Sequence, residues 1–210
     1  MITDLYIHRS YVRCVSDGYR WLAKNLAKVS KVMVPYFLCF SIVFVLSNAV
    51  NTHANVAILA GKQIFIEEVI AAIILGVLSF ITYIVALARM LKMFKQMFGI
   101  SAKLKGNIGR AIKGVFRHFG KVLGTTLLAL FIACVLSVVV YLPYVVSTYA
   151  YFSSIEAQVN FGDTAEISNG GYAVMLTTCA ICYTIINTIS VGFYASLLFL
   201  YGSLRAGRNA

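Results

Sequence analysis

Four long apolar runs alternate with shorter polar stretches along the chain. The runs cover residues 32–50, 69–90, 122–149 and 172–203, and within them the only charged residue is Arg89, near the end of the second. As helices, each is long enough to cross about 30 Å of hydrocarbon. The pattern predicts an all-α integral membrane protein with four transmembrane helices. We expect Gly99 to end the second helix and Pro143 to kink or end the third.

The first and third runs are each preceded by a basic amphipathic segment, residues 16–30 and 107–121. Cations occupy one face of these segments and apolar residues the other; the cations are Arg20, Lys24, Lys28 and Lys31 in the first, and Arg110, Lys113, Arg117 and Lys121 in the second. This geometry is typical of interfacial helices that turn their cations toward anionic headgroups of the lipid bilayer. For the first segment, packing against the chain's own bundle uses the same apolar face, so that alternative stays open.

The order of elements occurs twice. Each amphipathic segment leads into an apolar run, a short loop and a second apolar run, and aligning Arg20 with Lys113 places Lys24 opposite Arg117. We therefore predict a single membrane domain of two tandem helix-hairpin units, residues 16–98 and 107–204, arranged as a parallel repeat. Two basic amphipathic helices resemble each other by necessity, so coincidence is the alternative.

Charge indicates the topology. The chain has 18 Lys and Arg residues against 7 Asp and Glu, and only Lys62 among these cations lies in the loops that follow the first and third runs. The positive-inside rule then puts both termini and residues 91–121 in the cytoplasm. Because the cations cluster at the ends of apolar runs and no nucleic-acid motif occurs, we expect no nucleic-acid partner. The short loops favour a prokaryotic plasma (inner) membrane.

A seam of small residues follows one face of the fourth run. It consists of Ala180, Thr184, Thr188, Gly192 and Ser196, and the third run has a shorter seam of Ala129, Ala133 and Ser137. Such seams allow close helix packing in lipid. We prefer packing to the lining of a pore, and we expect the third run to be the partner of the fourth. Asn187 is the candidate intramembrane polar site, although it can also bond across helices.

The sequence offers no catalytic residues, metal site or cofactor site. Cys179 and Cys182 form a CxxC pattern inside an apolar run without a second ligand pair. Glu67 and Glu68 suit the N-terminus of a helix better than a proton relay. We therefore expect no enzyme.

The expected function is that of a non-catalytic subunit, anchor or assembly partner in a membrane complex, with other membrane subunits or further copies of the chain as partners. The bare runs and small outer loops indicate it. The alternative is a small transporter or lipid-handling protein. The features that favour it are the repeat, Asn187 and the amphipathic segments.

The charge argument is tested with inserted reporters. A reporter at Ala102 is expected in the cytoplasm and one at Thr164 on the opposite side, because the cations flank only the first of these loops. Compartment-specific enzyme fusions measure this, and exchanged locations would invert the topology.

Overall fold

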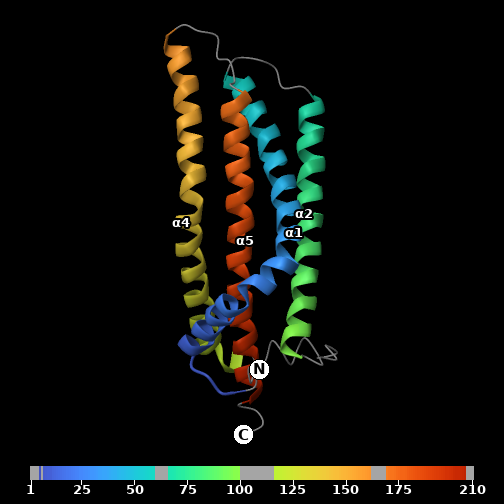
Figure 1. The fold of residues 1–210 in the computed structure, drawn as a ribbon, viewed down its shortest axis with the longest axis vertical. Helices are drawn as coiled ribbons and strands as arrows, with labels where there is room; N and C mark the ends of the chain where they lie inside the picture. Colours follow the sequence, from blue (N-terminus) through green and yellow to red (C-terminus); the bar gives the residue numbers. More distant parts are fainter. Residues whose placement is uncertain (1–4, 6, 60–65, 100–115, 162–168, 207–210) are drawn as a thin grey trace. The chain divides into compact units, whose positions relative to one another are not determined.

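The computed structural model describes residue 5 and residues 7–59, 66–99, 116–161 and 169–206. These residues form four long helices, shown in Figure 1. They are α1 (Tyr11–Leu59), α2 (Ile66–Phe98), α4 (Phe119–Asn160) and α5 (Asn169–Ala206). All four are long and apolar enough to cross a membrane. The predicted all-α fold with four candidate membrane spans is therefore confirmed.

The helices are longer than the apolar runs. α1 has 49 residues, which at the helical rise gives about 74 Å, more than twice the hydrocarbon thickness of a bilayer. It includes residues 16–30, so the expected separate interfacial helix is instead the first part of α1. No glycine or proline stands between residues 19 and 34, and Pro35 lies inside the helix without ending it.

The two breaks expected from the sequence have different outcomes. α2 ends at Phe98, and Gly99 follows with φ of 58°, the left-handed conformation that commonly terminates helices. This break is confirmed. An early end at Pro143 is wrong, because α4 continues to Asn160. Most of the second amphipathic segment, 107–121, lies outside the described residues.

The chain divides by its contacts into two compact units. Unit 1 comprises Met1–Met33, Leu87–Ser137 and Asn187–Ala210, and unit 2 comprises Val34–Ala86 and Val138–Ile186. Every described Lys and Arg belongs to unit 1, whereas the described acidic residues of unit 2 are Glu67, Glu68 and Glu156. The division by contacts thus follows the division by charge.

An aromatic cluster forms much of the core of unit 1. The Trp21 ring of α1 lies 5.6 Å from the Phe94 ring and 4.9 Å from the Phe98 ring of α2, between ring centroids. Phe98 in turn meets Phe199 of α5 edge to face at 5.5 Å. Trp21 and these three phenylalanines are buried. Three helices are therefore joined by one set of large side chains.

Tyrosine and phenylalanine rings pack together in unit 2. The Phe44 and Tyr183 rings lie 4.7 Å apart, and Tyr183 meets Tyr141 edge to face at 5.9 Å. Tyr172 of α5 donates a hydrogen bond of 3.0 Å to the carbonyl oxygen of Ala49 in α1. Aromatic rings therefore contact one another in this unit, and the Tyr172 hydroxyl also joins α5 to the backbone of α1.

Candidate functional site

The small-residue seam of α5 is buried. Thr184, Thr188, Gly192 and Ser196 are all buried, and Ala180 is half-buried. Side chains of this size gain little in contact with acyl chains, but they admit another helix. The seam therefore lies in the protein interior.

The partner of the seam in unit 1 is α1, not α4 as the sequence suggested. A Cβ atom added to Gly192 would lie 2.8 Å from carbons of the Tyr19 ring and 3.1 Å from a Leu22 methyl carbon. One added to Gly18 would lie 2.6 Å from the backbone nitrogen of Ser196. The first turns of α1, expected on the membrane surface or packed on the bundle, fill the place that was assigned to α4.

Hydroxyl groups complete the α1–α5 contact. In unit 1, Ser196 Oγ donates to the Gly192 carbonyl at 2.8 Å and lies 3.5 Å from the Val15 carbonyl oxygen of α1. In unit 2, Thr184 Oγ1 is hydrogen-bonded to Ser41 Oγ of α1 at 3.1 Å, and both residues are buried. The seam thus contacts α1 within each unit.

The shorter seam of α4 also meets α1. Ala129 is fully buried, and its carbonyl oxygen accepts a 3.0 Å hydrogen bond from the Tyr19 hydroxyl. Ala133 and Ser137 are half-buried, as is Asn187 of α5. Tyr19 thereby lies against α5 through its ring and bonds to α4 through its hydroxyl.

An arginine that the sequence pattern did not identify, Arg9, is buried in unit 1. Arg9 is 6% exposed, and its Nε donates to Asp17 Oδ2 at 2.8 Å. Its Nη1 donates to the Leu5 and Ile7 carbonyl oxygens at 3.1 and 3.2 Å. The guanidinium carbon also lies 4.9 Å from the centre of the Phe199 ring. The charge is therefore paired, hydrogen-bonded and stacked, which are the conditions under which a buried cation is tolerated.

Ser203 of α5 joins the backbone of Arg9 and the side chain of Lys121. Its Oγ accepts hydrogen bonds from the Arg9 backbone N–H at 2.7 Å and from Lys121 Nζ at 2.9 Å, and donates to the Arg9 carbonyl at 3.3 Å. Beside it, Gly202 lies directly against the Leu5 carbonyl, leaving no room for a side chain. The N-terminal segment is thus fixed to the last turns of α5.

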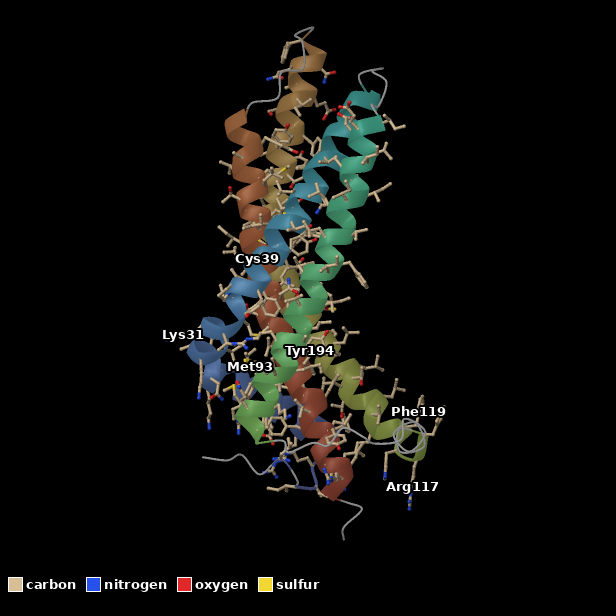
Figure 2. All side chains as sticks on the ribbon, turned by 90° about the vertical axis from the view of Figure 1, so that its right-hand side faces the viewer. Lys31, Cys39, Met93, Arg117, Phe119 and Tyr194 are labelled. Carbon is tan, nitrogen blue, oxygen red and sulfur yellow. The ribbon has the colours of Figure 1, made fainter. Side chains whose placement is uncertain are left out.

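The predicted surface cations have different positions. Arg20, Lys24, Lys28, Lys31 and Arg117 are exposed, and Figure 2 labels Lys31 on α1 and Arg117 just before α4. Lys121 is half-buried and bonded to Ser203, so its role is internal. Arg110 and Lys113 lie outside the described residues.

The sequence pattern does not identify Arg9 as a buried residue, because its partners are not three or four positions away on one helix. Asp17 is eight residues away, and Ser203 is separated from it by 194 positions. The start of α1, two residues after Arg9, does have a local sequence signal. Ser10 Oγ accepts a 3.3 Å hydrogen bond from the Arg13 backbone N–H. Such an N-cap marks the start of α1.

The possible ligand groups are dispersed. Among the described residues, no group of three His, Cys, Asp or Glu side chains could hold a metal ion. Cys179 and Cys182 are buried free thiols. Glu67 and Glu68 border a shallow hollow of about 250 Å³ in unit 2, together with Val50 and Ala71.

Comparison with known proteins adds no relative: no family model, curated protein or solved structure matches the chain.

The α1–α5 contact predicts different effects for one substitution at two glycines. Gly192→Leu is expected to destabilise the protein by roughly 1–3 kcal/mol through overpacking against Tyr19 and Leu22. Gly76→Leu is the matched control, because a Cβ there meets nothing within 4 Å. Leu198→Ala, at a half-buried position, is expected to cost less than Gly192→Leu. Thermal unfolding in detergent measures all three; equal melting temperatures for the two leucine variants would contradict the packing.

A second prediction concerns the buried ion pair. Asp17→Leu leaves the Arg9 charge buried without its carboxylate and should cost about 3 kcal/mol, the low end for buried pairs because Asp17 is 23% exposed. Arg9→Met combined with Asp17→Leu should recover part of that loss, since no charge is then left alone. Unfolding of both variants checks this, and a double variant that is no more stable than Asp17→Leu would contradict the prediction.

Proposed function

We propose that this protein is a non-catalytic, multi-pass subunit of a membrane complex that anchors or assembles partner subunits. The plasma (inner) membrane of a prokaryote, with both termini in the cytoplasm, is the proposed location. The observation that supports an assembly role is the surface of α2, which is the least covered of the four helices. In its most apolar stretch 6% of the residues are buried, against 28% for α1 and for α5.

The outer surface of α2 combines bulky apolar residues with one open small-residue position. Ile73 is 61% exposed and Phe80 65% exposed. Gly76 is exposed, and the space beyond its Cα holds no protein atom within 4 Å. Ala72 lies one turn before it, so the two make a small-xxx-small pair of the kind that admits a second helix.

The polar side chains near this position do not depend on a partner. Ser79 Oγ donates to the Gly76 carbonyl at 2.8 Å, and Thr82 Oγ1 donates to the Ser79 carbonyl at 2.9 Å. Their hydroxyl groups are satisfied within α2, so this face is stable both in lipid and against another helix. Gly192 and Gly202 of α5, in contrast, are already in contact with α1 or Leu5. We therefore assign the docking of a partner helix to α2.

Co-purification from native membrane in mild detergent tests this proposal. Gly76→Leu should reduce the amount of co-purifying subunit, or of self-associated chain, at least several-fold, because the leucine side chain blocks close helix approach. The variant should keep the melting temperature of the wild-type chain. Leu78→Ile, a conservative change at another exposed α2 position, serves as the control for altered surface. A monodisperse wild-type chain without any partner would refute the proposal.

A small transporter or lipid-handling protein is the second candidate, favoured by one observation in unit 2. The Tyr151 side chain is 6% exposed, and neither its hydroxyl nor Gln158 Oε1 has a hydrogen-bond partner in the described structure. Unsatisfied buried polar atoms suit a polar ligand or water. Substrate-dependent flux in vesicles, lost in Tyr151→Phe, would support this candidate over a subunit.

We propose that the helices are arranged as two tandem hairpins, residues 16–98 and 107–204, and that these two units arose by duplication. The order of elements supports both.

A further inference from the structure

The exposed cations of α1 form a narrow stripe beside its buried face. At about 100° per residue, Arg20, Lys24, Lys28 and Lys31 occupy an arc of about 80° on the helix. All four are exposed, whereas Trp21, Leu22 and Val29 are buried. The stripe lies directly beside the buried Trp21 and not on the opposite side of the helix. The turns of α1 that pack within unit 1 therefore also carry the exposed cations.

The charge of this basic stripe (Arg20, Lys24, Lys28 and Lys31) has no neutralising carboxylate among the described residues. None of the four forms an ion pair with a described residue. Asp17 precedes the stripe, but its carboxylate lies 2.8 Å from Arg9 Nε and 4.0 Å from Arg13 Nε. The stripe is therefore a concentrated positive surface that an external anion can reach.

Small apolar residues border the stripe on its solvent side. Ala23 and Ala27 are exposed and lie within about 60° of Arg20 around the helix. Cations next to exposed apolar side chains form the arrangement by which helices bind the headgroup and upper acyl region of a bilayer. A soluble acidic partner would explain the cations but not the apolar border.

We propose that the basic stripe binds the phosphodiester headgroups of anionic phospholipids on the cytoplasmic side of the membrane. Neighbouring cations three or four residues apart face each other at distances that let two side chains contact one phosphate group. The aliphatic stems of the lysines cover the apolar border while the ammonium groups reach the headgroups. This binding does not depend on α2 or on any partner subunit.

The test compares two pairs of lysines of equal charge. The full chain in neutral detergent is titrated with phosphatidylglycerol, and bound lipid is counted by native mass spectrometry. Each lysine lost from the stripe should weaken binding about fivefold, so Lys24→Gln combined with Lys28→Gln should weaken it about 25-fold. Lys92→Gln combined with Lys95→Gln, exposed on α2, should leave it within about twofold of wild type.

Further arms separate the source of the anion. Phosphatidylcholine should bind at least tenfold more weakly than phosphatidylglycerol, and Lys24→Arg combined with Lys28→Arg should retain binding. Inorganic phosphate at the same concentration should not displace the lipid.

Three outcomes would overturn the proposal. Equal losses in both glutamine pairs would mean a general charge effect, and displacement by phosphate would mean a free-anion site. Co-purification of an acidic protein through Lys24 and Lys28, with unchanged lipid binding, would assign the stripe to a protein partner. Circular dichroism of each variant confirms that the helices are intact.

Discussion

The close approach of α1 to α5 in unit 1 is the contact on which the other interactions of that unit depend. Gly18 faces the Ser196 backbone, and Gly192 faces the Tyr19 ring. In lipid, apolar side chains gain little from leaving acyl chains for another helix, so tight packing and hydroxyl bonds must supply the association. Once α1 lies in this groove, Tyr19 reaches the Ala129 carbonyl and Trp21 reaches Phe94 and Phe98.

The two units have different polar interiors, and their charge content explains the difference. Unit 1 contains a buried guanidinium, yet Asp17, two carbonyl groups and the Phe199 ring compensate its charge. Unit 2 uses uncharged groups instead, such as the buried Ser41–Thr184 pair. An uncompensated charge in hydrocarbon is costly, while hydroxyl groups can be satisfied by the helix backbone. The ionic network therefore occurs where cations are concentrated.

The sequence was sufficient for properties that depend on local pattern. Apolar length predicted four helices, and Gly99 predicted the end of α2. It was insufficient where tertiary contacts decide. The period of small residues showed that the α5 seam could admit a helix, but the same period suits α1 and α4 equally, and the choice depends on Gly18, which no α5 pattern reveals. Arg9 read as one more positive-inside cation because its main partners are eight and 194 residues away.

The attachment of the first residues to the last turns of α5 has a consequence for biogenesis. Arg9 leaves the ribosome long before Gly202 and Ser203, because Ser203 follows it by 194 positions in the chain. Until α5 has been synthesised, the contact surface for α1 does not exist, so the apolar face of Trp21 and Leu22 needs temporary cover from lipid or an insertion factor. Unit 1 can therefore be completed only after α5 has been synthesised, and any nascent chain lacking α5 leaves Arg9 without its Ser203 and Phe199 contacts. Such a chain still has the Asp17 carboxylate to pair with Arg9, but the guanidinium loses the cover that the Phe199 ring provides in the complete unit.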